Sequence, residues 1–296
     1  MKQIYLVDAS IYIFRAYFSI PEDLTDRRGN PVNAVYGFAS FLGGLLDRTR
    51  AGHVGVAFDE SLTTSFRNEI YPPYKSNRVL PPPELEAQLA ACQELAQAVG
   101  LASLVSSRYE ADDLIGTAAN TMRRAGFAAV IVSGDKDLTQ LIGPHDIWWD
   151  YSRDRQFDRA AIKEHFGVDP RQMVDLIALT GDAVDNIPGV PGIGPKTAIQ
   201  LLNHFGSLDA IYDRLDEIPA LSLRSAQRIH ALLKEGKDNA LLARRLAQIV
   251  IDAPIEVSPR SLTRRPIDEA QLQNLCKRLN FGDKLKTKLQ AASKRK

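Results

Sequence analysis

Long apolar runs and cysteines are both scarce in this chain of 296 residues, and each scarcity excludes a class of protein. No apolar run approaches the ~20 residues that a membrane-spanning helix needs. The N-terminus reaches an acid at Asp8 and lacks the pattern of a secretory signal peptide. The two cysteines, Cys92 and Cys276, lie far apart within helical patterns, which is typical of a reduced protein. We therefore expect a cytoplasmic protein that binds no membrane.

Positive charge is concentrated near the end of the chain. The net charge is +1, but residues 277–296 contain eight Lys or Arg and a single acid, which gives this segment +7. The rest of the chain therefore carries about −6. Such a basic segment is either a solvated end or a contact for nucleic acid, and charge alone leaves both interpretations open.

Acids follow several of the predicted strands. Short apolar runs predict strands that alternate with helices at residues 4–7, 53–58, 128–132 and 147–149. This alternation favours a mainly parallel sheet with helices on both faces, whose ligands bind beyond the carboxyl ends of the strands. The acids expected at that edge are Asp8, Asp59, Asp135 and Asp137. A single Asp after a strand is an ordinary turn residue, but a charge repeated at each such turn favours a binding site.

Three more carboxylates fall within four positions at the start of a predicted helix. They are Glu110, Asp112 and Asp113. The helix dipole favours one acid in a first turn, but three so close together repel one another. Because Mg²⁺ takes oxygen ligands, a divalent cation would relieve this repulsion. Asp182 and Asp185, three apart at a helix end, add two further acids.

The segment 61–82 differs from the helices and strands around it. It contains four prolines, few apolar residues, and the cations and tyrosines Arg67, Tyr71, Tyr74, Lys75 and Arg78. An irregular surface loop is the simpler interpretation. A mobile cover over the acidic edge is the functional one, with cations for phosphates and tyrosines that stack on bases.

The chain after residue 155 is expected to contain helices only. Their predicted ranges are 159–166, 170–180, 195–205, 208–215, 222–233, 239–247 and 267–279. A glycine-rich loop with Gly189, Gly192 and Gly194 opens the helix that carries Lys196. Free backbone N–H groups at such a helix start could hold a phosphate and grip a nucleic-acid backbone without reading bases. A merely structural helix–helix turn stays open.

These motifs, in this order, resemble the 5′-nuclease (flap endonuclease) family, and above all the N-terminal 5′-3′ exonuclease part of bacterial DNA polymerase I. The stretches that carry the resemblance are Leu6-Val-Asp8, Ala34-Val-Tyr-Gly-Phe38, Val56-Ala-Phe-Asp59, Ser65-Phe-Arg67, Tyr74-Lys75, Tyr109-Glu-Ala-Asp-Asp113, Asp135-Lys-Asp-Leu138, Leu179-Thr-Gly-Asp182, Asp185-Asn-Ile-Pro-Gly189, Gly192-Ile-Gly-Pro-Lys-Thr-Ala198 and Leu279-Asn-Phe-Gly282. Two departures are Ala9-Ser10 after Asp8 and Ser133-Gly134 before Asp135, and neither removes an acid. No polymerase sequence follows, so we expect a stand-alone protein.

The resemblance implies a fold and a division of the chain. It implies an α/β fold of the PIN and 5′-nuclease type, with a mainly parallel central sheet flanked by helices and a helical C-terminal part. Residues 1–155 would form the catalytic domain, with a helical arch at 61–82. Residues 156–285 would form a helical DNA-binding region with a helix-hairpin-helix at 174–205, and residues 286–296 a basic tail.

The resemblance also implies site residues, position by position. The metal-site acids would be Asp8, Asp59, Glu110, Asp112, Asp113, Asp135, Asp137, Asp182 and Asp185. The catalytic cations would be Lys75, Arg78 and Arg15. The DNA contacts would be Arg67, Tyr74, Gly189, Gly192, Gly194, Lys196 and Thr197. The expected cofactors are two Mg²⁺ or Mn²⁺ ions, with K⁺ at the helix-hairpin-helix.

The function implied is a structure-specific 5′-3′ exonuclease or flap endonuclease, acting as a monomer on DNA with 5′ flaps, 5′ ends or branches in replication or repair. Nine clustered carboxylates exceed what one ion can use, which favours hydrolysis with two metal ions. A DNA-binding paralogue with little catalysis and a metal-dependent phosphatase or RNase are the alternatives. The residues leave open the preference for flaps or ends, the physiological metal, the pathway, activity on RNA, and whether the basic tail binds DNA or protein.

Overall fold

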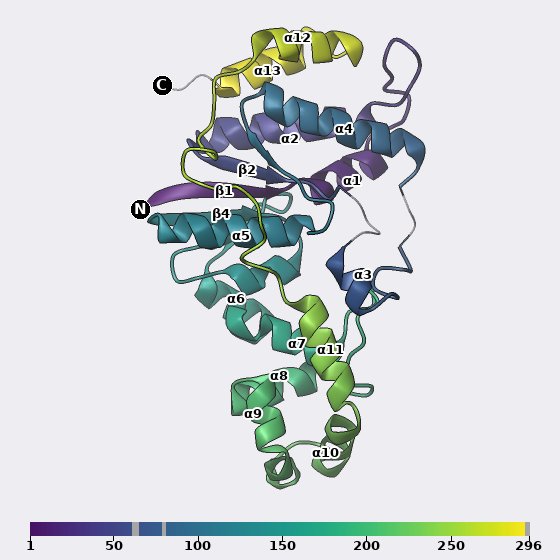
Figure 1. Ribbon diagram of the computed structural model, residues 1–296, viewed down its shortest axis with the longest axis vertical. Coiled ribbons are helices and arrows are strands. Elements are labelled where there is room, and N and C mark those ends of the chain that lie inside the picture. The colour runs from purple at the N-terminus through teal and green to yellow at the C-terminus, as the bar shows by residue number, and fades with distance from the viewer. Residues whose placement is uncertain (61–64, 79–80, 294–296) are drawn as a thin grey trace.

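A computed structural model describes residues 1–60, 65–78 and 81–293, and it centres on one six-stranded sheet (Figure 1). The strand order is β3-β2-β1-β4-β5-β6, in which only the β5–β6 pair is antiparallel. The strands are β1 (Lys2–Asp8), β2 (Val54–Ala57), β3 (Ala102–Leu104), β4 (Phe127–Val132), β5 (Ile147–Asp150) and β6 (Arg155–Phe157). The predicted mainly parallel α/β sheet is confirmed.

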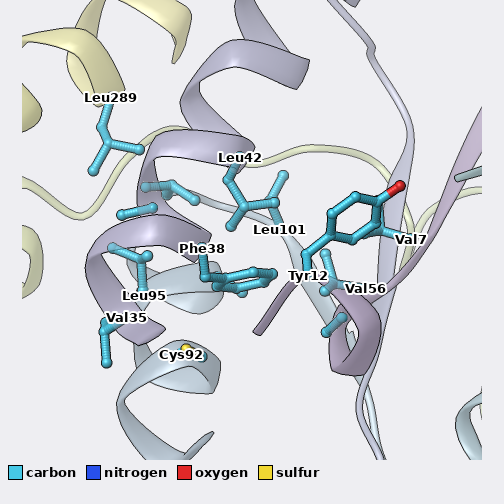
Figure 2. Close-up of a cluster of buried hydrophobic side chains, with 14 of the residues drawn as sticks. Val7, Tyr12, Val35, Phe38, Leu42, Val56, Cys92, Leu95, Leu101 and Leu289 are labelled. Atoms are coloured by element: carbon cyan, nitrogen blue, oxygen red, sulfur yellow. The ribbon is translucent and has the colours of Figure 1, made fainter. Parts of the chain in front are cut away.

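Helices cover both faces of the sheet because side chains of a strand point alternately to its two faces. In β1, Ile4 and Leu6 pack with α5, whereas Val7 packs with α2 and α4. The helices of the α/β part are α1 (Ala9–Ser19), α2 (Asn33–Thr49), α3 (Phe66–Ile70), α4 (Pro83–Ala98), α5 (Ala111–Arg124) and the 3₁₀ helix η1 (Lys136–Leu141). Figure 2 shows the core beneath α2 and α4, where Phe38 and Leu42 meet Val56 and Leu95.

A helical part follows the sheet and has a core of its own (Figure 1). It consists of α6 (Arg159–Phe166), η2 (Pro170–Gln172), α7 (Met173–Thr180), α8 (Pro195–Phe205), α9 (Leu208–Asp213), η3 (Leu215–Ala220), α10 (Ala226–Glu235) and α11 (Lys237–Ala247). The glycine loop joins α7 to α8, as the predicted helix-hairpin-helix requires. No helix in the described ranges is both long and apolar enough to cross a membrane.

The end of the chain returns to the sheet as two helices, α12 (Glu269–Arg278) and α13 (Asp283–Ser293). They lie over α2 and α4, on the face opposite α5 (Figure 1). Leu285 and Leu289 of α13 are buried in the core of that face. The segment predicted as a basic tail is therefore mostly a packed helix. Its apolar positions were obscured by the surrounding lysines, and residues 294–296 lie outside the described residues.

Two strands were not predicted. β3 has three residues and β6 has the polar sequence Arg-Gln-Phe, so neither is long enough to show a strand period. β6 also corrects the expectation of helices only after residue 155. It pairs with β5 and closes the sheet with an antiparallel edge.

Candidate active site

A cavity of about 380 Å³ opens at the carboxyl edge of the sheet, and most of the predicted acids line it. Its acids are Asp8, Asp59, Glu110, Asp112, Asp135 and Asp185. Its cations are Arg15, Lys75 and Arg78, which are the three predicted catalytic residues. Residues separated by almost the whole α/β part thus converge on one space, which we call the carboxylate cavity.

Two serines that depart from the family pattern hold two of these acids. The hydroxyl of Ser133 donates to Asp8 Oδ2 at 2.8 Å, and the hydroxyl of Ser10 donates to Asp59 Oδ2 at 2.7 Å. Asp59 also accepts the backbone N–H of Ala111 at 2.8 Å, so the start of α5 is tied to the end of β2. Sequence reasoning missed that Ser133 and Ser10 position two of the acids, and the only signal was the departure itself.

The acids nearest the strand ends are held close together in a poorly solvated space. Burial, and then the charge of Asp59, raise the pKa of Asp8 to about 7. Burial, and then Asp135, raise the pKa of Asp112 well above its ordinary value. Burial likewise raises the pKa of Asp135. The three carboxylates therefore destabilise one another when all are ionised.

Cations from the segment after α3 balance the other side of the cavity. Lys75 Nζ lies 2.8 Å from Glu110 Oε1 and 3.9 Å from Asp185 Oδ2. Arg78 forms an ion pair with Asp185. Burial alone would raise the pKa of Glu110, but Lys75 and Arg67 hold it below its ordinary value. The ionised form is thus favoured at Glu110, whereas burial disfavours it at Asp8, Asp112 and Asp135.

The structure places Asp113 outside the carboxylate cavity, contrary to its predicted role as a metal-site acid. Its fully buried carboxylate receives Arg67 Nη1 at 2.7 Å and Arg67 Nη2 at 2.8 Å. It also accepts the backbone N–H of Val250 at 2.8 Å. With its oxygens occupied in this way, Asp113 joins α3, α5 and the chain after α11, and we assign it a structural role.

Arg67 and Tyr74 were predicted to contact DNA, and the structure buries both. Arg67 is 2% exposed and Tyr74 is 4% exposed. Arg67 donates to Asp113, to Glu110 and to the carbonyls of Leu246 and Gln248, while the Tyr74 hydroxyl lies 3.0 Å from Glu110 Oε2. Side chains buried in this way cannot stack on a base or reach a phosphate. Their contacts hold Glu110 in place instead.

Asp137 and Asp182 lie beside the carboxylate cavity and share a lysine. Lys136 Nζ is 3.4 Å from Asp137 Oδ1 and 3.1 Å from Asp182 Oδ2. Burial, and then Asp135, raise the pKa of Asp137 to about 7. The backbone N–H of Asp137 donates to the Asp135 carboxylate at 2.8 Å. This bond links Asp137 to an acid that lines the carboxylate cavity.

The described part of the predicted arch is docked rather than free. Residues 65–78 contain α3 and a series of turns that lie against residues 183–186. The backbone N–H of Lys75 donates to the carbonyl of Asp185 at 2.9 Å, and Asn77 and Asn186 add side-chain bonds across the contact. The predicted mobile cover would also include residues 61–64 and 79–80, which lie outside the described residues.

The glycine loop between α7 and α8 is built around close backbone contacts. A Cβ at Gly189 would stand 2.3 Å from the backbone N of Gly181, so only glycine fits there. Gly192 has φ +86°, and a Cβ on it would meet Leu232 at 2.9 Å. Gly194, by contrast, faces open space, and Lys196, which follows Pro195, is exposed. The start of α8 is therefore accessible to a ligand, as is required of a backbone-gripping loop.

Oxygen donors fit a hard divalent cation here, although not as a preformed cage. Among the described residues, no three acidic, His or Cys side chains stand in a ready metal-binding arrangement. Asp137 Oδ1 is buried and accepts no hydrogen bond from the described residues, although it is ion-paired with Lys136 Nζ at 3.4 Å. The Asp112 carboxylate forms no hydrogen bond with the described residues, so its oxygens retain free lone pairs. Since Mg²⁺ keeps several of its waters, spaced carboxylates of this kind suit it.

Aromatic side chains of α1 form part of the wall of the carboxylate cavity. Phe14 and Phe18 line the carboxylate cavity, and Phe18 is 78% exposed. They were not predicted, because a short apolar helix after a strand is typical of core packing. One turn apart on α1, they present an apolar surface beside the acids.

The raised pKa of Asp8 gives the first testable prediction. A carboxyl with a higher pKa in the folded chain binds its proton more tightly there, so metal-free stability falls as pH rises from about 4, the unfolded value, to about 7. Asp8→Asn removes this cost. In EDTA, the melting temperature of Asp8→Asn should exceed that of the wild type by more at pH 8 than at pH 4. Asp23→Asn, at an exposed position, should leave the melting temperature unchanged at both pH values. An equal difference at both pH values would contradict the prediction.

The fold and the carboxylate cavity define an α/β protein of the nuclease class. Two family models match: "5'-3' exonuclease, N-terminal resolvase-like domain" at residues 3–167 and "5'-3' exonuclease, C-terminal SAM fold" at residues 168–270. Together they cover most of the sequence. The chain belongs to the 5′-3′ exonuclease family.

Relatives with full-length and partial matches agree with this assignment. A 5′-3′ exonuclease of Buchnera aphidicola subsp. Schizaphis graminum is 34% identical over 282 residues, which cover 95% of this chain and 98% of that protein. DNA polymerase I of Bacillus caldotenax is 40% identical over 284 residues, which cover 95% of this chain and 32% of that protein. The chain thus spans about a third of the length of the polymerase relatives it matches.

Solved structures share the fold over nearly the whole chain. The T5 5′-exonuclease with bound divalent zinc has a TM-score of 0.68 and 19% identity, and the match covers 98% of each chain. The catalytic core of Rad2 in complex with DNA substrate has a TM-score of 0.66 and 16% identity, with 99% of this chain and 93% of that one covered. At such identities the likeness concerns the fold alone.

Proposed function

We propose that this protein is a structure-specific 5′-3′ exonuclease and flap endonuclease that hydrolyses DNA phosphodiester bonds with two divalent cations, in DNA replication or repair. The observation that carries the proposal is the meeting of six carboxylates and three cations in one cavity beside a helix-hairpin-helix. Its substrates would be DNA with 5′ flaps, 5′ ends or branches, which it would bind as a monomer.

The lining of the cavity supports an assignment of the metal-holding residues. Those that line it include Asp8, Asp59, Asp112 and Asp135. Burial and the charges of the other three raise the pKa of Asp112, so we propose that these four hold the first ion. Asp185, with Asp137 and Asp182 beside it, would hold the second ion. Mg²⁺ or Mn²⁺ in these positions would supply a nucleophilic water at neutral pH and stabilise the leaving oxygen.

The chain's own cations would act on the phosphate. Lys75 and Arg78 lie on the cavity opposite the strand ends, paired with Glu110 and Asp185. A phosphate that enters between the two sides would meet their positive charge where negative charge builds in the transition state. Arg15, exposed on α1 at the cavity rim, would bind a neighbouring phosphate.

The helix-hairpin-helix would hold the duplex through its backbone. The exposed start of α8 offers free N–H groups, with Lys196 and Thr197 beside them, to a phosphate. A potassium ion bound by loop carbonyls would complete this grip. Contacts of this kind position DNA without reading its sequence.

Gly194→Ala provides a clean test of this grip. The added methyl meets no protein atom and the φ of Gly194 is −92°, so the fold should be unaffected. The methyl would, however, stand where a phosphate approaches the start of α8. We expect duplex affinity to fall roughly tenfold, equally for unrelated sequences, because one charge-assisted contact is lost. Fluorescence anisotropy on two duplexes measures this. A loss on one sequence only would contradict backbone binding.

A DNA-binding paralogue with little catalysis is the second candidate. It is favoured by one observation: Lys75 and Arg78 are ion-paired with the site acids Glu110 and Asp185. A phosphatase or RNase with a small substrate is disfavoured, since it would need no helix-hairpin-helix. Incubation of the protein with a 5′-flap duplex, with Mg²⁺ and then with excess EDTA, tests the proposal. Cleavage that occurs only with Mg²⁺ would support the proposed nuclease. Binding of the flap duplex without cleavage would instead support the DNA-binding paralogue.

A further inference from the structure

A second cavity, of about 530 Å³, lies between α3, α7 and α11 and shares no residue with the carboxylate cavity. Three arginines line it: Arg171, Arg244 and Arg245. Phe66 and Ile70 of α3 contribute an apolar wall. We call it the arginine cavity. Phe66 is half-buried. Cations beside an aromatic side chain are typical of surfaces that bind single-stranded nucleic acid.

Two of the three arginines are available for an anion. Arg244 is paired with Asp209 at 2.8 Å. The side chains of Arg171 and Arg245 are exposed and form no hydrogen bond or ion pair with any residue that the structure describes. The remaining acid, Asp175, accepts the backbone N–H of Leu208 at 2.9 Å, and burial raises its pKa. Positive charge therefore dominates the open side of the cavity.

The arginine cavity and the carboxylate cavity lie on two sides of a single side chain. Arg67 Nη1 contacts Glu110, which lines the carboxylate cavity, at 3.2 Å. Arg67 Nη2 contacts the carbonyl of Gln248, which lines the arginine cavity, at 3.0 Å. The base of the arch segment thus separates a place where a phosphodiester bond would be cut from a second, basic place immediately beyond it.

We propose that the arginine cavity binds backbone phosphates of the single-stranded 5′ segment of the substrate, beyond the bond that is cleaved. This inference rests on the proposed function, because it needs a strand that continues past the carboxylate cavity. Arg171 and Arg245 contact two phosphates, while Phe66 and Ile70 face a sugar or base. A volume of about 530 Å³ is that of a pocket for a small ligand and admits a nucleotide or two, but not a duplex.

The test compares two substrates that differ only in the displaced strand. One is a nicked duplex with no flap, and the other carries a single-stranded 5′ flap of about 20 nucleotides, long enough to reach well beyond the cut. Equilibrium dissociation constants are measured in Ca²⁺ over a range of salt concentrations. For Arg171→Ala with Arg245→Ala, we expect affinity for the flap substrate to fall about tenfold, and the salt slope to fall by about 1.4, as for two single-strand phosphates. Affinity for the unflapped duplex should not change.

A charge-matched control removes the same two charges elsewhere. The control variant combines Arg124→Ala with Lys163→Ala. Arg124 is exposed at the end of α5 remote from the carboxylate cavity, and Lys163 is exposed on α6. This variant should leave the affinities for both substrates unchanged. Arg171→Lys with Arg245→Lys should restore most of the salt slope. Methylphosphonate linkages, which remove phosphate charges, should weaken binding of the flap substrate by the wild type but not by the Arg171→Ala, Arg245→Ala variant.

Two outcomes would overturn the inference. An equal loss on both substrates would show that the arginines contact duplex DNA, and no loss on either would show that the cavity binds no nucleic acid. Cleavage of both substrates in Mg²⁺ is scored separately. If the wild type cleaves nothing, the proposed function fails, whereas the binding comparison still judges the cavity.

Discussion

Asp135→Asn should reduce single-turnover cleavage of a 5′-flap substrate by on the order of 10³-fold while leaving DNA binding in Ca²⁺ largely intact. Asp135 lines the carboxylate cavity, and burial raises its pKa, so an amide in its place removes a charge that the metal-free fold does not need. The fold should be at least as stable as the wild type in EDTA. The loss would then belong to the chemical step, because structure and affinity are preserved.

Asp113→Asn is the matched control for this prediction. It removes the same charge three positions after Glu110, but from a carboxylate bound to the buried Arg67 rather than from the cavity. A buried guanidinium that keeps only the longer ion pair to Glu110 should destabilise the fold by roughly 3 kcal/mol. Thermal unfolding therefore separates the two variants: only Asp113→Asn should melt earlier. Turnover by the wild type in excess EDTA would contradict the metal assignment altogether.

The sheet was predictable because its long strands are continuous apolar runs. The runs around Val7, Val56 and Ile131 are buried on both faces, and each ends at the edge where an acid follows. An acid after a buried strand has to lie at the carboxyl edge, so the carboxylate cavity followed from topology. The strands β3 and β6 are too short to show the alternation of side chains that is typical of a strand. Their positions in the sheet depend on pairing with β2 and β5.

The roles of adjacent acids could not be read from the sequence. Asp112 and Asp113 are neighbours, yet successive residues on a helix point about 100° apart. One therefore lines the carboxylate cavity while the other faces Arg67 and Val250 in the interior. That difference is set by the chain after α11, more than a hundred positions away. Arg67 was likewise predicted to contact DNA, because the sequence does not show the tertiary contacts that bury it.

The arch segment is arranged to hold Lys75 at the cavity. Lys75 has φ +54°, a left-handed conformation that is unfavourable for a side chain with a Cβ. The backbone bond from its N–H to Asp185 compensates for that strain. Its Nζ lies 2.8 Å from Glu110, and its side chain is 11% exposed. A strained, nearly buried cation among carboxylates is a costly arrangement for a residue that would only attract DNA.

Lys75→Ala decides whether the arch segment takes part in the chemistry. If Lys75 only steers DNA, affinity should fall, the salt slope should shrink by about one unit, and the chemical step should hardly change. If it lies on the reacting phosphate, its contact is strongest in the transition state. The single-turnover rate at saturating protein should then fall by on the order of 10²-fold or more, with a much smaller change in affinity. We expect the second outcome, and a smaller effect in the same direction for Arg78→Ala.

The measurement pairs single-turnover cleavage of a 5′-flap substrate in Mg²⁺ with an equilibrium titration in Ca²⁺. Lys136→Ala is the matched control, since Lys136 also pairs with two acids of the site, Asp137 and Asp182, but does not line the carboxylate cavity. Its rate should change far less than that of Lys75→Ala. A rate for Lys75→Ala close to that of the wild type, with weakened binding, would make the arch segment a steering surface. The chemistry would then rest on the acids at the strand ends and the ions they hold.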